Sequence, residues 1–161
     1  MQANSNELEL DHAFWNALVA NRPFQTWLLS RTKFETRSLC LVTDEKWHQR
    51  WYRDPETGKD SETDILLMWR DEESGERFAI HIENKPAHRA WESSQAINYR
   101  RRAENRKKAW RYTDFELVLL APLAFVARHQ SEAAHFDIAL TYEEVGTFVP
   151  AFAAAATDPV R

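Results

Sequence analysis

The stretch FAIHIENK, residues 78–85, begins as a buried β-strand and ends with a carboxylate and an ammonium group two residues apart. Strand side chains alternate between two faces, so His81, Glu83 and Lys85 share one face and the apolar side chains share the other. A strand that simply runs out into solvent would carry the same polar end. The stretch alone therefore leaves two interpretations open, an exposed strand end or a functional site at the end of the strand.

A second apolar run, DILLMWR at residues 64–70, lies just before this strand. The six residues between the two runs, DEESGE, form a turn-rich loop that favours an antiparallel hairpin. A register symmetric about this loop places apolar side chains opposite one another on one face, and a slip by one residue would scramble that face. The predicted pairs are Arg70 with Arg77, Trp69 with Phe78, Met68 with Ala79, Leu67 with Ile80, Leu66 with His81, Ile65 with Ile82 and Asp64 with Glu83.

In this register Asp64 and Glu83 become neighbours across the strands, with β-carbons roughly 4.5–5.5 Å apart. Two ionised carboxylates at that distance repel each other unless a positive charge lies between them. A hard divalent cation suits the position, because Mg²⁺ takes oxygen ligands and is commonly held by one or two carboxylates with water and substrate phosphate. Lys85 points to the same side. The sequence thus predicts a site for Mg²⁺, or Mn²⁺, at the end of the hairpin.

The rest of the chain predicts helices before and after these strands. Apolar spacing predicts helices at residues 5–20, 23–29, 92–112, 123–129 and 142–148, and strands at 64–70, 77–85, 116–121 and 136–141. Residues 37–52 fit either a strand pair or a helix followed by a strand. The order α, β, β, β, α, β predicts an α/β fold with a mixed central sheet flanked by helices. We expect a single domain over residues 1–150 and a flexible tail over 151–161.

Composition narrows the class of protein. Of the 161 residues, 43% are apolar and 12% aromatic, so the chain can build its own core. The single cysteine, Cys40, excludes an internal disulfide and a multi-cysteine metal site. The N-terminal residues lack the pattern of a secretory signal, and no apolar run reaches membrane-spanning length. We expect a cytoplasmic protein that has no contact with membranes.

A basic stretch stands out against the net charge of −4. RRRAENRKKAWR, residues 100–111, holds seven arginine and lysine residues against Glu104 alone. A solvated helix face is the ordinary explanation of a charge run. Clustering of one sign, while the rest of the chain is acidic, favours instead a surface that meets phosphate groups. The aromatic residues beside this helix, Trp91, Trp110 and Tyr112, fit either core packing or stacking on bases.

These residues resemble the PD-(D/E)xK nuclease superfamily. Asp64 precedes Glu83-Asn84-Lys85 by nineteen residues, and SETDI at residues 61–65 is similar to the E-S/T-D-I/L segment of small bacterial members. IENK at 82–85 and QAINYR at 95–100 resemble their I-E-N-K…Q-x-x-x-Y-R pattern. The resemblance covers about residues 6–148, and Thr63 stands where many members have proline. It implies a restriction-endonuclease-like α-β-β-β-α-β core.

The resemblance also implies roles for the site. Asp64 and Glu83 would bind the metal, with the Asn84 carbonyl as a further ligand. Lys85 would orient the attacking water and stabilise the hydroxide or the scissile phosphate, and Gln95 would face the active site from the next helix. The resemblance further suggests a glutamate from the first helix: Glu7 is favoured by its spacing to the apolar residues that follow, with Glu9 as the alternative.

The basic helix carries the predicted nucleic-acid contacts. Gln95, Tyr99, Arg102 and Arg106 follow a helical i, i+4, i+7, i+11 stripe, which we expect to face the active site and the nucleic-acid backbone. Lys107 is assigned to the same surface.

These observations together predict an Mg²⁺-dependent phosphodiesterase, a nuclease that acts on nucleic acid, with DNA favoured over RNA. A homodimer is compatible with the sequence. Two alternatives stay open: a catalytically inactive nuclease-fold module that binds nucleic acid, and a protein whose carboxylate pair is structural and whose basic helix binds an acidic protein partner. His81 fits either the site or the core, and the six histidines show no paired zinc-ligand spacing.

Overall fold

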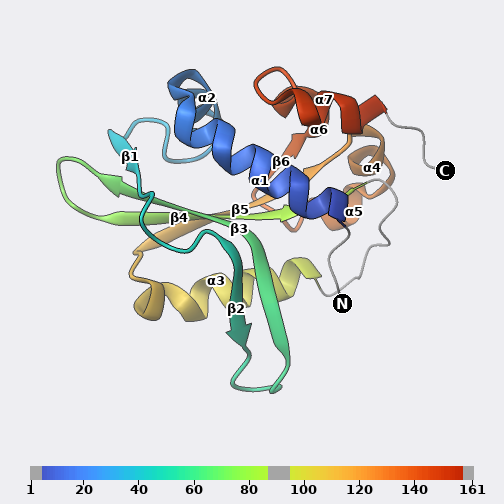
Figure 1. Ribbon diagram of the computed structural model, residues 1–161. Helices are drawn as coiled ribbons and strands as arrows, with labels where there is room; N and C mark the ends of the chain where they lie inside the picture. The colour runs from blue at the N-terminus through green and yellow to red at the C-terminus, as the bar shows by residue number, and fades with distance from the viewer. Residues whose placement is uncertain (1–4, 87–94, 158–161) are drawn as a thin grey trace.

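The computed structural model describes residues 5–86 and 95–157, which form a mixed α/β fold around one curled sheet (Figure 1). The strands run in the order β1-β3-β4-β5-β6, and β2 pairs with β3 off this path. Pairing is antiparallel between β3 and each of β1, β2 and β4, and parallel from β4 to β5 to β6. The strands are β1 (Leu39–Leu41), β2 (His48–Arg53), β3 (Asp60–Asp71), β4 (Arg77–Asn84), β5 (Asp114–Ala121) and β6 (Ile138–Thr141).

Helices cover both faces of the sheet. One layer holds α1 (Ser5–Ala20), α2 (Arg22–Ser30), α6 (Tyr142–Val145) and α7 (Pro150–Thr157), while α3 (Gln95–Trp110) lies on the opposite face (Figure 1). Two short helices, α4 (Leu123–Arg128) and α5 (Gln130–Ala133), connect β5 to β6. None of the described helices is both long and apolar enough to cross a membrane.

Two apolar cores result from the alternation of side chains along the central strands. Ile65 and Leu67 of β3 contribute to the core beneath α1, and Leu66 and Met68 contribute to the core beneath α3. β5, a continuous apolar run, supplies both cores, as expected for a strand buried on both faces.

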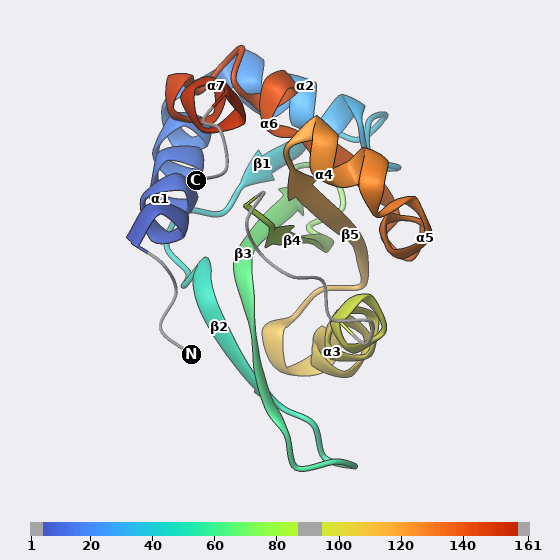
Figure 2. The same cartoon turned by 90° about the vertical axis from the view of Figure 1, so that its right-hand side faces the viewer.

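The hairpin register agrees with the sequence prediction. Six of the predicted pairs are present, from Arg70 opposite Arg77 to Ile65 opposite Ile82. The ladder stops there, so Asp64 and Glu83 lie immediately beyond its last pair. Below this point β3 pairs with β2, and the β2–β3 hairpin extends well away from the rest of the sheet (Figure 2). The candidate site therefore lies where β3 and β4 diverge.

The structure decides one segment that the sequence leaves open and corrects another. Residues 37–52, left open in the sequence, contain the strands β1 and β2. Residues 151–157, predicted as flexible tail, belong to helix α7, because Phe152 inserts into the core beneath α1. Gly146 permits this packing: a β-carbon there would lie 2.7 Å from the backbone nitrogen of Ala153. Residues 92–94, predicted to begin the basic helix, lie outside the described residues.

Candidate active site

The carboxylates Asp64 and Glu83 meet at the point where β3 and β4 separate. The backbone N–H of Asn84 donates to Asp64 Oδ2 at 3.0 Å. Lys85 Nζ lies 3.6 Å from Glu83 Oε1, and both of these side chains are buried. The Lys85 backbone N–H donates to the Leu120 carbonyl at 2.8 Å, which holds the end of β4 against β5. The structure thus brings together Asp64, Glu83, Asn84 and Lys85 just beyond the last pair of the β3–β4 ladder.

Negative charge is concentrated around Asp64. Burial raises the pKa of its carboxyl group well above the ordinary value, and the charges of Glu83, Asp11 and Glu7 raise it further. The hydrogen bond from Asn84 acts in the opposite direction. A group of neighbouring carboxylates in a low-dielectric setting takes up either a proton or a cation, since ionisation of all of them is costly. The site therefore favours a bound positive charge.

Helix α1 supplies two of these carboxylates. Glu7 and Asp11 lie one turn apart on its buried face, and Asp11 is only 2% exposed. Further along the same face the helix buries Phe14 and Leu18 in the apolar core. Glu9, the alternative to Glu7 in the sequence prediction, is exposed. Between the two candidates, Glu7 is the one that the structure places toward the site.

Asp11 is a site residue that the sequence prediction missed. Its Oδ1 accepts a hydrogen bond from Asn84 Nδ2 at 2.8 Å, and its Oδ2 lies 3.1 Å from His48 Nε2. The Tyr142 hydroxyl donates to Asn84 Oδ1 at 2.5 Å. Asp11 and Tyr142 thus fix the side chain of Asn84. The backbone N–H of Asn84 in turn binds Asp64, so Asp11 acts on the predicted metal ligand Asp64 through Asn84. The spacing of Asp11 four residues after Glu7, on one helix face, is the sequence signal that could have identified it.

On the other side of the sheet, α3 supports the site from within the core. The Tyr99 hydroxyl accepts a hydrogen bond from the Asp64 backbone N–H at 3.4 Å. Burial raises the pKa of Tyr99, and the charges of Asp64 and Glu83 raise it further. Arg102 stacks over the Tyr99 ring, with 4.3 Å between the guanidinium carbon and the ring centroid. Its Nη1 donates to the Glu62 carbonyl at 2.5 Å and to Thr63 Oγ1 at 2.9 Å.

This placement corrects the predicted nucleic-acid contacts of Tyr99 and Arg102. Arg102 is 2% exposed and Tyr99 is 3% exposed, so neither presents its polar group to an external phosphate. They instead hold the backbone just before Asp64. Of the predicted stripe, Tyr99 and Arg102 pack against the sheet. Gln95 begins the same helix, and its side chain lies outside the described part of the structure.

The remaining cations of α3 are more exposed, and most of them have acidic partners. Arg106 lies over the Tyr52 and Trp110 rings at 4.9 and 5.5 Å, and Lys107 pairs with Glu104 at 3.0 Å. The other ion pairs of the basic helix join Arg100 to Asp137, Arg101 to Asp54 and Glu56, and Arg111 to Glu45. Surface pairs of this kind contribute little stability, so phosphate groups can replace the carboxylates at small cost.

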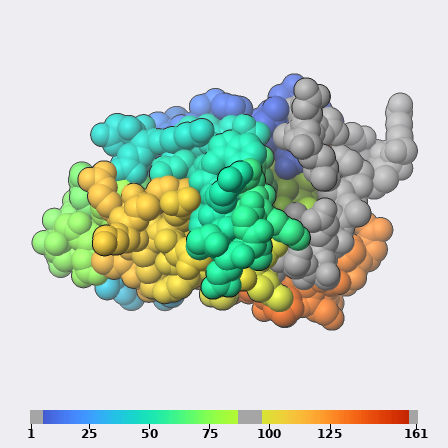
Figure 3. Space-filling view, turned by 90° about the horizontal axis from the view of Figure 1, so that it is seen from below, coloured from blue at the N-terminus to red at the C-terminus, as the bar shows by residue number. Residues whose placement is uncertain are grey.

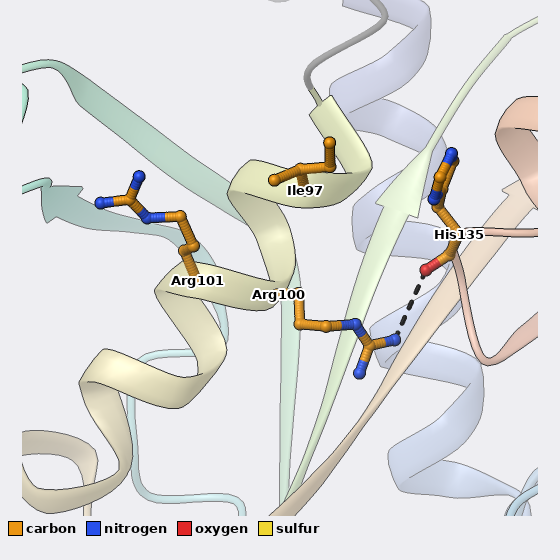
Figure 4. A pocket seen from close by; sticks show the side chains of 4 residues that line it. All are labelled: Ile97, Arg100, Arg101 and His135. Carbon is orange, nitrogen blue, oxygen red and sulfur yellow. Dashed lines mark hydrogen bonds between the residues drawn. The ribbon is translucent and has the colours of Figure 1, made fainter.

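A pocket of about 180 Å³ lies beside the first turns of α3 (Figure 4). Ile97, Arg100 and Arg101 line it from the helix, and His135 lines it from the loop before β6. The Arg100 guanidinium reaches the His135 carbonyl at 3.4 Å, whereas Arg101 points away toward the turn after β2. Arg100 is thus directed to Asp137 and His135, and this pocket adds no free cation to the site.

The donor set fits a hard divalent cation. Carboxylate and carbonyl oxygens are the ligands that Mg²⁺ and Mn²⁺ prefer. Within residues 5–86 and 95–157, no group of three or more His, Cys, Asp or Glu side chains is arranged to hold a metal ion. Mg²⁺ commonly retains several waters and needs only one or two protein carboxylates, so Asp64 and Glu83 satisfy its chemistry without a third.

Comparisons with known proteins do not assign the chain. No family model matches it, and no curated protein matches it at a significant level.

Replacing Arg102 should test its structural role. We expect Arg102→Met to lower the free energy of unfolding by roughly 2–4 kcal/mol, because buried acceptors at Glu62 and Thr63 lose their donor. Arg106→Met, which removes a more exposed guanidinium of the same helix, should cost less than about 1 kcal/mol. Urea unfolding of both variants measures the difference. Equal stability of the two variants would contradict the buried role of Arg102.

Proposed function

We propose that the protein is a metal-dependent nuclease that hydrolyses phosphodiester bonds of DNA, built on a restriction-endonuclease-like core of the PD-(D/E)xK type. The observation that supports this most directly is the convergence of Asp64, Glu83 and Lys85 where β3 and β4 diverge. Further carboxylates from α1 act on Asp64. A purely structural pair of carboxylates gains nothing from such neighbours, whereas a metal site uses them.

The metal would be held by Asp64, Glu83 and the Asn84 carbonyl. When bound, it would supply Lewis-acid polarisation of the phosphate and a nucleophilic water near neutral pH. The side chain of Asn84 is already fixed by Asp11 and Tyr142. This pre-arrangement limits the reorganisation needed on metal binding and keeps the ligands in place during a reaction cycle.

Lys85 would add a positively charged side chain to the metal site. Its ammonium group is buried beside Glu83, in surroundings where an electrostatic interaction is stronger than in water. In this position the ammonium group can donate a hydrogen bond to the attacking water and stabilise negative charge on the phosphate oxygens. Such stabilisation is most effective when it grows as charge develops in the transition state.

The nucleic acid would approach along α3. Arg106 and Lys107 remain candidates for backbone contacts, since both are part-exposed. The choice of DNA over RNA rests on the family resemblance. Contacts of this kind carry no base information, so affinity should depend strongly on salt and weakly on sequence.

Metal binding is the first test of the site. Calorimetric titration with Mn²⁺ should show binding that is lost in Asp64→Asn and in Glu83→Gln, and retained in Asp44→Asn, which changes an exposed carboxylate. Without metal at neutral pH, Asp64→Asn should be more stable than the wild type by about 0.2–1 kcal/mol or more, because a repelled carboxylate is removed. This gain should shrink at lower pH, where the raised pKa of Asp64 lets the folded wild type take up a proton. Unchanged Mn²⁺ affinity in both site variants would contradict the proposal.

Cleavage is tested with plasmid, linear and single-stranded DNA and with RNA, each with Mg²⁺, Mn²⁺ or a chelator. The proposal expects DNA cleavage that requires metal and disappears in Glu83→Gln. Binding of DNA without any cleavage would favour the inactive binding module instead.

A further inference from the structure

A second pocket, of about 370 Å³, lies at the C-terminal end of α3. It is lined by Glu45, Lys46, Arg50, Ala109, Trp110 and Arg111. The chain leading into β2 forms one wall and the last turn of α3 forms the other, and Figure 3 shows these two segments side by side on the face below the sheet. None of the lining residues belongs to the carboxylate site.

The charge of this pocket is positive and only partly balanced. Its one carboxylate, Glu45, accepts from Arg77 Nη2 at 2.8 Å and lies 3.4 Å from Arg111 Nη2. In the described part of the chain, no carboxylate lies within ion-pair distance of Lys46 or Arg50; the Arg50 guanidinium instead donates to the Lys46 carbonyl at 2.8 Å. Two cations of the pocket are therefore available to a negatively charged ligand.

Arg50 is held in place by aromatic packing. Its guanidinium carbon lies 4.6 Å from the Trp110 ring centroid, and Arg106 approaches the same ring at 5.5 Å. Burial lowers the pKa of Arg50, Arg106 and Arg77 lower it further, and Glu45 acts against this trend. Guanidinium groups crowded in this way gain from a bound anion. A planar guanidinium with fixed orientation is also suited to bidentate contacts with phosphate oxygens.

The C-terminal end of a helix is normally unfavourable for an anion, because its carbonyl groups carry partial negative charge. Arg77 reduces this effect here. Its Nε donates to the Arg111 carbonyl at 2.7 Å, and its Nη2 reaches the Trp110 carbonyl at 3.4 Å. Arg77 thus binds two carbonyl groups at the helix end as well as Glu45, and so partly neutralises the negative charge around the pocket.

We propose that this pocket is a phosphate-binding subsite apart from the carboxylate site, in which Lys46 and Arg50 take up one phosphate group and Arg111 exchanges its contact with Glu45 for the same phosphate. The phosphate chemistry follows from the pocket itself. That the phosphate belongs to a DNA backbone lying along α3 rests on the proposed nuclease function, and a free phosphate or phosphomonoester is the other source of the same chemistry.

The experiment measures binding with chelator present, so that neither cleavage nor the metal site affects it. Anisotropy of a labelled DNA duplex should show about ten-fold weaker binding for Arg50→Gln at low salt, and a salt slope reduced by about one unit. Arg22→Gln, which changes an exposed arginine of α2 in the opposite layer, should change neither quantity. Glu45→Gln removes a competing negative charge and should bind DNA more tightly, a gain that misfolding cannot produce.

Calorimetry with inorganic phosphate and pyrophosphate distinguishes the two sources. Loss of both DNA and phosphate binding in Arg50→Gln supports the subsite with a DNA backbone as its ligand. Loss of phosphate binding with unchanged DNA affinity supports the pocket and assigns it to a small phosphorylated ligand. If Arg50→Gln does not fold, Arg50→Lys replaces it in both measurements, once its melting temperature is shown to match the wild type. Arg50→Lys should keep only part of the affinity for DNA and phosphate. Wild-type affinity for DNA and phosphate in the Arg50 variants overturns the subsite, and so does weaker DNA binding by Glu45→Gln. If only the nuclease proposal fails, metal-dependent cleavage is absent but these binding results are unchanged.

Discussion

Replacing Lys85 by methionine should lower single-turnover DNA cleavage by about 10²-fold or more, while DNA affinity changes by less than about three-fold. Methionine approximates the length of the lysine side chain and fits a buried position, so the change removes charge more than volume. The lost stabilisation belongs mainly to the transition state, because the ammonium group acts on charge that develops during the reaction. Rapid-quench kinetics with enzyme in excess over DNA measure the effect.

Two further variants make this result specific. Lys85→Arg should rescue cleavage poorly, since a planar guanidinium cannot occupy the position of a compact ammonium group beside Glu83. Lys107→Met removes a lysine of α3 that pairs with Glu104, and should weaken DNA binding slightly with little effect on the bound-state cleavage rate. Undiminished cleavage by Lys85→Met would mean that the site is misassigned or that another nuclease is present.

Lys85 also balances charge in the metal-free protein. It is the cation beside Glu83, and Asp64 lies among further carboxylates from α1. Without the lysine these buried carboxylates lose a compensating charge, so Lys85→Met should be less stable than the wild type in chelator and regain stability with Mn²⁺. The same residue thus links the electrostatics of the fold to the proposed chemistry.

The sequence could predict the central hairpin because one physical constraint dominated it. Apolar side chains on one face of β3 and β4 match only in a single register, and a one-residue slip would scramble that face. That register in turn places Asp64 near Glu83. The mixed sheet and its flanking helices follow from the order of the elements. The sequence does not reveal helix α7, because the alanine-rich residues 151–157 show little amphipathic pattern around Phe152.

The remaining site residues depend on contacts between distant segments, which spacing alone cannot define. Asp11 acts through Asn84, 73 positions away in the chain. Arg102 illustrates a different limit: charged side chains in a basic run suggest an exposed face, yet this one is buried over Tyr99 and bonded to the backbone before Asp64. A long arginine can satisfy its donors inside a protein when carbonyl and hydroxyl acceptors are present there. The spacing of residues along one helix face does not reveal whether that face lies against the sheet or against solvent.

The sequence allows His81 to lie either in the site or in the core, and the structure places it in a buried network. Thr63 Oγ1 accepts from Arg102 and lies 3.3 Å from His81 Nδ1, while His81 Nε2 lies 3.2 Å from the Tyr112 hydroxyl. Because the Tyr112 hydroxyl donates to the Ala103 carbonyl, its oxygen is left to accept from His81 Nε2–H. The Thr63 hydroxyl then donates to Nδ1. These contacts assign a neutral imidazole with its proton on Nε2.

Acid should therefore destabilise the fold through His81. Burial, together with the nearby charges of Arg102 and Arg50, lowers the pKa of His81 from the ordinary 6.5 to about 3. The unfolded chain takes up a proton on this residue as the pH falls below about 6.5, while the folded protein does so only near pH 3, so stability is present at neutral pH and is lost as the pH falls. Between about pH 7 and about pH 4.5, the unfolding free energy of the wild type should fall by roughly 2.5 kcal/mol more than that of His81→Gln.

Urea unfolding of both proteins across this range, in chelator, measures that difference, and carboxylates common to the two proteins cancel in the comparison. His12→Gln, which replaces an exposed histidine of α1, should show the wild-type dependence. His81→Gln will be less stable at neutral pH, because the exchange disturbs contacts to Thr63 and Tyr112, so the slope with pH and not the absolute stability is decisive. Parallel slopes for the wild type and His81→Gln would mean that the imidazole takes up its proton at the same pH in the folded and unfolded states, which contradicts a neutral imidazole held in this buried network.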